Sequence, residues 1–503
     1  MQIPISEIEN QKKIMRTIRE EFSQKIMDAA QSAKPLGYVD TYGCQQNESD
    51  SEKIRGMLIE MGCVITHDEY VADIIVINTC AIRENAENRV FGNVGDLVHT
   101  KKAKPNQLIA VCGCMAAISE NVERIRDKYK HVDMVFSPAD LWRFPELVYQ
   151  VLSEKHPTKE DKEQSAKTRE RIKKSKTLHT LPSSEYPQAR IAEGLPNHRD
   201  MKIKAWLPIM HGCNNFCAYC IVPYVRGREV SREPSAILAE AKEIIDAGYK
   251  DITLLGQNVN SYNPVPSGKA CEVSEVSDFP KLIRELSKLD GEFLIRFMTS
   301  HPKDAGEELF RAMAESEKVA RHIHLPFQAG NDRILKLMNR GYTSAEYLDK
   351  LAFARELMPD IVITSDVIVG YPGETDEEFE DTLRLVEKAQ FDAMFTFIYS
   401  RRPHTAAAKL SDTTTREEKQ IRFDKLLELQ NAISDEKHVR HVGKTVRVLV
   451  DDFVSDDEVY SLRARTNGGR LVHLIGDSDM VGKFADIKII KSSTWALFGE
   501  KKR

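Results

Sequence analysis

Short apolar runs and longer amphipathic stretches alternate along most of the chain. The runs have the length of strands and end at glycine or polar residues, as at 73–78 and 108–111. The longer stretches repeat apolar residues at the three- and four-residue spacing of a helix face, as at 344–358 and 376–389. Strands that alternate with helices favour parallel sheets, so we place the chain in the α/β class.

The N-terminal region predicts an open parallel α/β sheet. Residues 1–33 form a charged helical extension, and residues 34–154 form a domain with strands near residues 38, 73 and 108. Because the extension has an apolar face, we expect it to pack on a neighbouring domain. The residues on that face are Ile14, Ile18, Phe22 and Ile26.

Two further domains follow a connector. Residues 155–200 are rich in Lys, Glu, Ser and Pro and lack apolar periodicity. Residues 201–437 contain six strand-and-helix units, which predict a curved parallel sheet short of the eight units of a closed barrel. Residues 438–503 contain short strands separated by Asp, Asn and Gly, as in a small β-barrel. The six central strands are expected at 204–210, 251–255, 293–298, 321–324, 362–367 and 393–399.

Composition limits the class of protein. With 503 residues and 41% hydrophobic content, the chain is long enough for about three globular domains. No apolar run approaches the roughly 20 residues that cross a bilayer, and the N-terminus is charged, so we expect a cytoplasmic protein without a membrane partner. Basic and acidic residues number 72 and 77, so binding of a nucleic acid would need a local basic surface.

Nine cysteines without a secretory leader indicate reduced thiols and metal ligation rather than disulfides. Cys213, Cys217 and Cys220 have the spacing C-x3-C-x2-C directly after the first central strand. That end of a parallel sheet is where ligands usually bind. A 4Fe-4S cluster normally takes four thiolates, so three would leave one iron open to another ligand. The alternative is structural zinc, although zinc sites of that kind are closed by four ligands.

A second set of three cysteines stands at predicted strand ends. Cys44, Cys80 and Cys114 are far apart in the sequence, but each follows a strand of the N-terminal sheet. Parallel strands bring such ends to one edge, where three thiolates could hold a second cluster with an open iron. Cys112, two residues before Cys114, competes for the third position.

The first cysteine loop and the six-unit sheet resemble the radical S-adenosylmethionine superfamily. The resemblance implies that Cys213, Cys217 and Cys220 are catalytic, and that the open iron binds S-adenosylmethionine and yields a 5′-deoxyadenosyl radical from it. Tyr219 matches a position beside the adenine, although it could equally keep water away from the cluster. The glycines at 370 and 373 match a cofactor loop but could serve only as a turn. The positions that match cofactor contacts are Tyr219, Gly256, Gln257, Asn258 and Asp366.

Further motifs resemble the methylthiotransferase family of radical S-adenosylmethionine enzymes. They lie at 42–50, 78–86 and 112–114, and again at 220–232, 324–330 and 366–374. The resemblance covers about residues 37–500 and implies two 4Fe-4S clusters, the auxiliary one on Cys44, Cys80 and Cys114. The C-terminal barrel resembles the TRAM module, which binds RNA. Its phosphate-facing residues would be Arg463, Arg465 and Arg470, unless these are ordinary surface arginines.

The branches of this family differ in substrate. Gly43-Cys-Gln-Gln-Asn47 is closest to the branch that modifies N(6)-isopentenyladenosine beside the tRNA anticodon, and the alternative is the branch for threonylcarbamoyladenosine. The implied partners are that tRNA, a sulfur donor, and an electron donor such as flavodoxin or ferredoxin, and we expect a monomer. His404 departs from the glycine usual in the family. A hypothesis from another class is a non-catalytic RNA-binding protein whose cysteines hold structural metal.

Overall fold

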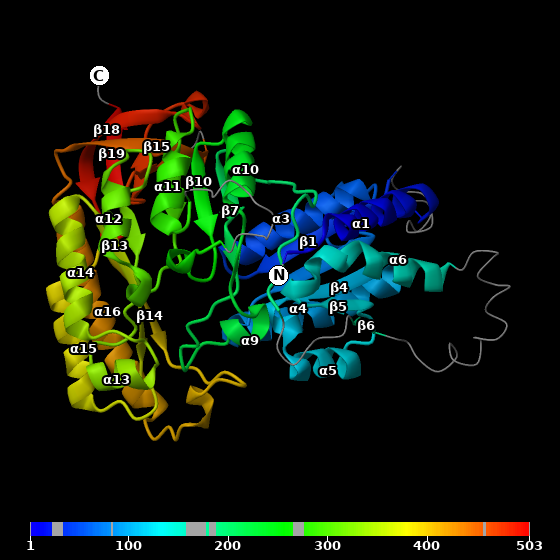
Figure 1. The fold of residues 1–503 in the computed structure, drawn as a ribbon, viewed down its shortest axis with the longest axis horizontal. Helices are drawn as coiled ribbons and strands as arrows, with labels where there is room; N and C mark the ends of the chain where they lie inside the picture. The colour runs from blue at the N-terminus through cyan, green and yellow to red at the C-terminus, as the bar shows by residue number, and fades with distance from the viewer. Residues whose placement is uncertain are drawn as a thin grey trace. The chain divides into compact units, whose positions relative to one another are not determined.

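The computed structural model describes residues 2–22, 34–81, 84–156, 178–180, 188–264, 276–455 and 459–501 (Figure 1). These residues form two compact units. The N-terminal unit comprises Met1–Asp200, His211–Asn214 and Ile221–Val230. The C-terminal unit comprises Met201–Met210, Asn215–Cys220 and Ser231–Arg503. Most of the predicted connector, and the predicted helix position Ile26, lie outside the described residues.

The N-terminal unit contains the predicted open parallel sheet. Its six strands lie in the order β2-β1-β3-β4-β5-β6, and every neighbouring pair is parallel. The three predicted strands are the adjacent strands β1, β3 and β4. The strands are β1 (Leu36–Tyr42), β2 (Val64–Ile65), β3 (Ile74–Thr79), β4 (Leu108–Gly113), β5 (Met134–Phe136) and β6 (His179–Thr180).

Helices cover both faces of this sheet because successive side chains of a strand point to opposite faces. Ile74 and Val76 of β3 pack with the N-terminal extension and helices α3 and α6, whereas Ile75 and Ile77 pack with α4 and α5. The extension therefore packs on this unit, as its apolar face predicts. The helical elements are α1 (Ile5–Thr17), η1 (Ile18–Phe22), α3 (Gln45–Glu60), α4 (Glu84–Ala103), η2 (Cys114–Ala117), α5 (Ser119–Lys128), η3 (Pro138–Arg143), α6 (Phe144–Lys155) and α9 (Val222–Arg226).

The C-terminal unit contains all six predicted central strands, but they form two three-stranded parallel sheets. The orders are β11-β10-β7 and β12-β13-β14. A single parallel bridge joins Ile295 of β11 to Val319. The strand ladder is therefore interrupted between β11 and β12, because β11 bonds to residues 318–320, which precede β12. The strands are β7 (Lys204–Pro208), β10 (Asp251–Leu255), β11 (Leu294–Phe297), β12 (His322–His324), β13 (Val362–Val369) and β14 (Ala393–Ile398). The short strands β8 (Met210–His211) and β9 (Val230–Ser231) pair with each other.

Helices follow these strands and begin at sites that the sequence marks. Thr343, Thr375 and Thr415 each accept a hydrogen bond from a glutamate backbone N–H three residues later, while that glutamate caps the threonine N–H in return. These capping boxes satisfy backbone donors that a helix start leaves free. The helical elements are α10 (Pro234–Asp246), η5 (Val259–Ser261), α11 (Phe279–Lys288), η6 (Pro302–Asp304), α12 (Glu307–Ala314), α13 (Asp332–Leu337), α14 (Ser344–Leu357), α15 (Asp376–Ala389), η7 (Ala407–Lys409) and α16 (Arg416–Val439).

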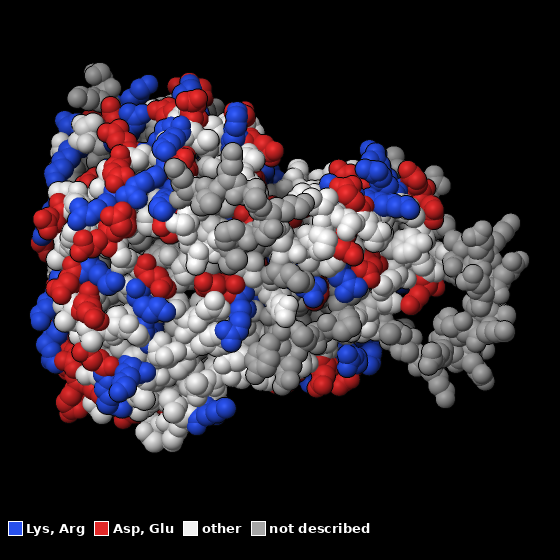
Figure 2. Space-filling model, in the orientation of Figure 1, with Lys and Arg blue, Asp and Glu red and all other residues white. Residues whose placement is uncertain are grey.

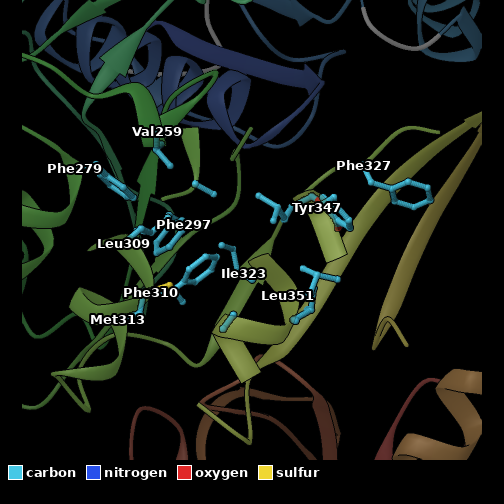
Figure 3. Close-up of a cluster of buried hydrophobic side chains, with 14 of the residues drawn as sticks. Val259, Phe279, Phe297, Leu309, Phe310, Met313, Ile323, Phe327, Tyr347 and Leu351 are labelled. Atoms are coloured by element: carbon cyan, nitrogen blue, oxygen red, sulfur yellow. The ribbon is translucent and has the colours of Figure 1, made fainter. Parts of the chain in front are cut away.

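Aromatic side chains fill much of the core between these strands and helices. Figure 3 shows Phe297 of β11 near Phe279 of α11 and Phe310 of α12. The rings of Phe279 and Phe297 meet edge to face with their centroids 5.0 Å apart. Phe327 lies with Tyr347 of α14, 5.8 Å between centroids. This packing leaves the loops at the carboxyl ends of the strands to hold polar groups.

The C-terminal strands close into the predicted small barrel. Its order is β15-β16-β17-β19-β18. The apolar interior contains Val450, Leu462, Val472 and Ile487, all fully buried. The elements are β15 (Thr445–Phe453), β16 (Leu462–Thr466), β17 (Leu471–Leu474), η8 (Ser478–Met480), β18 (Phe484–Ser492) and β19 (Leu497–Lys501).

The barrel is joined to the central strands by buried charges within the C-terminal unit. Arg470 of the barrel donates to the carboxylate of Asp392, at 2.6 Å, and Lys437 of α16 lies 3.1 Å from the same oxygen. Burial would raise the pKa of Asp392, but Arg470 and Lys437 lower it overall. Arg296 of β11 also donates to the backbone carbonyl of Asn467, at 2.7 Å. The prediction that Arg470 faces RNA phosphates is therefore corrected, because its guanidinium is buried in this interface.

The loop after β14 keeps the shape that a glycine would favour. His404 has a φ of 65°, which lies in the left-handed region. This conformation costs a residue with a side chain roughly 1–2 kcal/mol. His404 therefore has a backbone conformation that a glycine adopts at lower cost.

Charges are mixed on the visible surface. Figure 2 shows basic and acidic side chains intermingled over the C-terminal unit, in keeping with the near balance of 72 basic and 77 acidic residues. Among the described residues, the helices are all too short or too polar to pass through a membrane.

Arg470→Ala should destabilise the protein by on the order of 3 kcal/mol, because it removes one partner of a buried carboxylate. Arg440→Ala is the control, since its ion pair with Glu436 is exposed and should contribute less than about 1 kcal/mol. Urea unfolding midpoints at pH 7 measure both. Because the folded pKa of Asp392 is lowered, its stabilisation is full above the unfolded value of about 3.9 and is lost as the pH falls below it. Equal midpoints for the two variants at pH 7 would contradict this interface.

Candidate functional site

Three cysteines follow adjacent strands of the N-terminal sheet. Cys44 comes two residues after β1, and Cys80 and Cys114 come directly after β3 and β4. The strand ends are in register, with Tyr42 beside Thr79 and Thr79 beside Gly113. The structure therefore brings these residues to one edge of the sheet, as their positions at predicted strand ends imply.

Two buried asparagines fasten this edge. The side-chain amide of Asn78 donates to the backbone carbonyl of Asn47, at 2.8 Å, and Asn47 donates to the carbonyl of Thr79, at 3.0 Å. The oxygen of the Asn47 amide lies 3.3 Å from the sulfur of Cys44. These bonds tie the start of α3 to the end of β3, so the asparagines position Cys44. Both asparagines lie in the sequence motifs around the cysteines. Their position in those motifs is the signal that could have identified them from the sequence.

Gly113 allows the last strand to approach. Its φ is 92°, and a Cβ added there would lie 2.3 Å from the carbonyl oxygen of Thr79. A side chain is excluded both by the contact and by the conformation. The glycine thus places Cys114 directly beside the end of β3.

Cys114 is buried next to a cation and to the other two thiols. Burial raises the pKa of the Cys114 thiol to about 12, Arg226 acts in the opposite direction, and the charges of Cys80 and Cys44 raise it further. The three thiols are therefore close enough to interact. Cys112 points elsewhere and packs in the apolar core with Met134 and Phe136, so the geometry favours Cys114 as the third member of the set.

The segment that follows Cys220 also belongs to the N-terminal unit. Ile221 and Val225 pack with Ala81 and Cys114. At the end of α9, Nε of Arg226 lies 3.2 Å from the sulfur of Cys114, and its Nη2 lies 2.9 Å from a carboxylate oxygen of Asp50. Local sequence patterns do not indicate this pair, because its members are 176 positions apart.

Cys213 lies at the start of the C-x3-C-x2-C loop in a tight turn of the N-terminal unit. Its backbone N–H donates to the carbonyl of Gly227, at 3.1 Å. Gly212 has a φ of 79°, and a Cβ there would lie 2.3 Å from the carbonyl oxygen of Arg228. The first cysteine of the loop, like Cys114, therefore follows a glycine that permits a close backbone approach.

Cys217 lies in the C-terminal unit with two nitrogen donors at its sulfur. Nη1 of Arg340 is 3.4 Å away and Nε2 of His301 is 3.8 Å away. Burial lowers the pKa of His301 to about 2, so the ring is neutral. Its Nδ1 accepts from the backbone N–H of Lys303, at 3.2 Å, which leaves the proton on Nε2 facing the sulfur.

Tyr219, between Cys217 and Cys220, is half-buried with its hydroxyl 3.3 Å from Arg340. Burial raises the pKa of Tyr219 well above its ordinary value, so the hydroxyl keeps its proton. Cys220 is less buried than Cys217, and its N–H donates to the carbonyl of Cys217, at 2.9 Å. These contacts fit the second role considered for Tyr219, which is to restrict water near the cysteines.

Three of the predicted cofactor residues follow β10, and a fourth lies on β13. Gly256, Gln257 and Asn258 follow β10, and a Cβ at Gly256 would lie 2.4 Å from Cγ of Met210. Asn258 donates to Asp304, at 2.7 Å. Asp366 lies on β13, with its carboxylate 3.4 Å from Nε2 of His324.

Several buried polar atoms near these strand ends lack a protein partner. They are Oδ1 of Asn258 after β10, Oγ of Ser300 after β11 and Oε1 of Gln328 after β12. An unsatisfied buried polar atom costs about 1–3 kcal/mol, so a polar ligand at this end of the sheets would relieve the cost. The residues present thus fit S-adenosylmethionine, which presents amino, carboxyl, ribose and adenine groups.

The cysteine sets also fit iron-sulfur clusters, which thiolates hold. Among the described residues, no three His, Cys, Asp or Glu side chains lie close enough to hold a single metal ion. A 4Fe-4S cluster is wider than one ion, so its thiolates stand farther apart around it.

A row of aromatic and basic residues crosses the surface of the barrel. Arg463 pairs with His473 across β16 and β17, His473 pairs with Phe498 of β19, and Phe498 pairs with Lys491 of β18. The rings of His473 and Phe498 are stacked with centroids 5.3 Å apart, and Tyr460 lies 5.0 Å from Phe498. We call these residues the barrel row. Sequence reasoning identified only Arg463, because strand pairing brings the others together.

Comparison with known proteins decides the family. Residues 207–386 match the Radical SAM superfamily, residues 37–137 match "Uncharacterized protein family UPF0004", and residues 439–502 match the TRAM domain. The tRNA-2-methylthio-N(6)-dimethylallyladenosine synthase of Thermoanaerobacter sp. (strain X514) is 44% identical over 495 residues, which cover 98% of this chain and 97% of the relative. The chain belongs to this synthase family. The synthase of Acetivibrio thermocellus is 45% identical over 467 residues, which cover 93% of this chain and 91% of the relative.

The fold of this family member also resembles a solved structure. The radical S-adenosylmethionine methyltransferase TsrM of Kitasatospora setae has a TM-score of 0.52 and 13% identity, covering 75% of each chain. This likeness concerns the fold. Membership of the Radical SAM superfamily gives this synthase-family chain S-adenosylmethionine and iron-sulfur as its cofactors.

Gly113→Ala should lower the free energy of unfolding by about 2–4 kcal/mol, since it combines an unfavourable φ with a backbone contact that must shift. Gly92→Ala is the matched control, because an added Cβ in α4 has nothing within 4 Å and should stabilise the helix by about 0.4–1 kcal/mol. Urea unfolding of the metal-free protein measures both. A Gly113→Ala variant as stable as the parent would show that the strand ends do not need this approach.

Proposed function

We propose that this protein replaces the hydrogen on carbon 2 of N(6)-isopentenyladenosine, beside the anticodon of tRNA, with a methylthio group. The observation that supports this most strongly is 44% identity over 98% of the chain to a synthase named for that product. The motif Gly43-Cys-Gln-Gln-Asn47 supports the same branch over the one that acts on threonylcarbamoyladenosine.

We assign a separate cluster to each cysteine set. Cys213, Cys217 and Cys220 would hold the 4Fe-4S cluster that binds S-adenosylmethionine, and Cys44, Cys80 and Cys114 would hold an auxiliary 4Fe-4S cluster. When bound, these groups supply a 5′-deoxyadenosyl radical and the sulfur to be inserted. No side-chain acid or base could remove the hydrogen of that aromatic carbon at a useful rate, so the difficult step is left to the cofactors.

The protein's own residues bind, orient and exclude water. Asn258, Ser300 and Gln328 offer unpaired buried polar atoms to the cofactor. His301 and Arg340 donate to the sulfur of Cys217, which stabilises its thiolate and fixes its direction. Gly256, Gln257 and Asp366 complete the proposed cofactor contacts.

The barrel row supports a contact with an unstacked base of the anticodon loop. RNA is read mostly where bases are splayed out and stack on aromatic side chains, and arginine or lysine nearby holds the phosphates. His473 and Phe498 supply the rings, while Arg463 and Lys491 supply the charges. Arg465 is half-exposed but ion-paired with Asp451, at 3.2 Å, so its contribution is smaller.

The remaining partners follow from the chemistry. Radical formation needs a one-electron donor, for which flavodoxin or ferredoxin is suited, and turnover needs a sulfur donor. We propose that the protein works as a monomer in the cytoplasm, where tRNA is modified.

Cys217→Ala should abolish cleavage of S-adenosylmethionine to 5′-deoxyadenosine, whereas Cys80→Ala should retain part of the cleavage and lose methylthiolation. Each variant should hold about four irons per chain instead of about eight after anaerobic reconstitution. Chromatography of 5′-deoxyadenosine and mass spectrometry of the nucleoside measure the two reactions. Cys63→Ala is the control, because this buried cysteine belongs to neither set.

Two outcomes would overturn parts of this assignment. If Cys80→Ala still formed the full amount of methylthiolated product, the assignment of an auxiliary cluster to Cys44, Cys80 and Cys114 would be wrong. Stoichiometric zinc with no 5′-deoxyadenosine would favour the non-catalytic RNA-binding protein. The substrate branch is tested by incubating the reconstituted protein with two anticodon stem-loops, one with isopentenyladenosine and one with threonylcarbamoyladenosine. Only the first should gain the methylthio group.

Phe498→Ala should weaken binding of the isopentenyladenosine stem-loop by about 1–3 kcal/mol, the usual contribution of one stacked base. Arg463→Gln should lower the slope of log affinity against log salt by about 1. Fluorescence anisotropy over a range of salt concentrations measures both. Tyr70→Ala, which removes an exposed aromatic of the N-terminal unit, is the control. Unchanged binding by Phe498→Ala would place the RNA on another surface.

A further inference from the structure

In each cysteine set, a buried arginine donates to the sulfur of a cysteine. In the C-terminal unit, Nη1 of Arg340 lies 3.4 Å from the sulfur of Cys217. In the N-terminal unit, Nε of Arg226 lies 3.2 Å from the sulfur of Cys114. The arginines are only 4% and 5% exposed. Both sulfurs therefore face a permanent positive charge in surroundings that screen it weakly.

The two arginines differ in their counter-ions. Arg226 pairs with the carboxylate of Asp50, at 2.9 Å, and both side chains are buried. Within the described ranges, no carboxylate lies at ion-pair distance from Arg340. Its other hydrogen bonds go to the hydroxyls of Tyr219 and Tyr342 and to the carbonyl of Pro326. The charge beside Cys114 is thus neutralised locally, whereas the charge beside Cys217 is not.

A buried guanidinium without an anion is unfavourable, because hydroxyls and carbonyls solvate the charge but do not neutralise it. The thiolate of Cys217 and the cluster that it would hold supply the missing negative charge. An electron added to that cluster increases the negative charge and so strengthens the attraction to Arg340. At Cys114 the same addition meets a pair whose net charge is zero, so the attraction is weaker.

We propose that this difference directs the reducing electron to the cluster at Cys217. Arg340 acts as a positioning residue, because its positive charge favours the reduced form of that cluster. The Arg226–Asp50 pair has no net charge, so the auxiliary cluster stays harder to reduce. The inference rests on the proposed function, because it requires both clusters. In the step concerned, a low-potential one-electron donor loses one electron and one ferric ion of the first cluster becomes ferrous. No proton moves, since Arg340 is charged before and after. An electron held instead by the auxiliary cluster would be unavailable for cofactor cleavage.

Two backgrounds isolate the clusters for measurement. The triple variant Cys44→Ala, Cys80→Ala, Cys114→Ala retains the first, and Cys213→Ala, Cys217→Ala, Cys220→Ala retains the auxiliary one. Iron is counted after anaerobic reconstitution, and the midpoint potential is measured by dithionite titration followed by electron paramagnetic resonance.

Arg340→Gln keeps an N–H donor but removes the charge. In the first background it should reduce the equilibrium constant for electron uptake at least about tenfold, which is about 59 mV toward more negative potential for one electron. Arg340→Lys keeps the charge and should stay close to the parent. In the second background, Asp50→Asn removes the compensating charge and should shift the midpoint of the auxiliary cluster in the positive direction.

The outcomes separate this inference from the proposed function. A background that binds no iron refutes the cluster assignment before any potential is measured. Full iron with unchanged midpoints in Arg340→Gln and Asp50→Asn overturns the charge argument alone. If Arg340→Gln fails to load its cluster, Asp50→Asn in the other background decides, and an unchanged midpoint there overturns the proposal.

Discussion

Three parallel strands of the N-terminal sheet end at the same level, and a cysteine lies one or two residues after the end of each strand. The register between β1, β3 and β4 sets how far apart Cys44, Cys80 and Cys114 can lie. Gly113 permits the close approach of β4 to the end of β3, and the amides of Asn47 and Asn78 hold α3 against the end of β3. A shift of one residue in any of the three strands would turn a cysteine to the other face. The proposed sulfur chemistry therefore depends on backbone pairing before it depends on any side chain.

Much of this arrangement could be predicted from the sequence. Apolar runs located β3, β4 and all six central strands within a few residues, because a buried parallel strand has a strong local signature. The threonine and glutamate spacing at Thr343, Thr375 and Thr415 likewise marks helix starts by a local rule. The choice between Cys112 and Cys114 required the structure, because both faces of β4 are apolar and only the structure shows that the strand ends between these two residues.

Other features depend on partners that are distant in the sequence. Arg470 resembles a surface arginine until Asp392, 78 positions earlier, is found beside it. His473 and Phe498 are unremarkable in the sequence, yet the pairing of β17 with β19 stacks them. The break between β11 and β12 also has no local signal, since it reflects which residues pair with β11. Long-range electrostatics and strand pairing are thus what the sequence pattern leaves undetermined.

The segment Ile221–Val230 directly follows Cys220 in the chain but belongs to the N-terminal unit, where Arg226 contacts Cys114. Sequence boundaries drawn near residue 200 would assign it to the other domain. A chimera that exchanged the N-terminal domain between relatives at that boundary would combine the arginine of one parent with the cysteines and aspartate of the other. Recombination within the family must therefore keep two separated stretches of sequence together, which makes the units inseparable as evolutionary modules even though each has its own core.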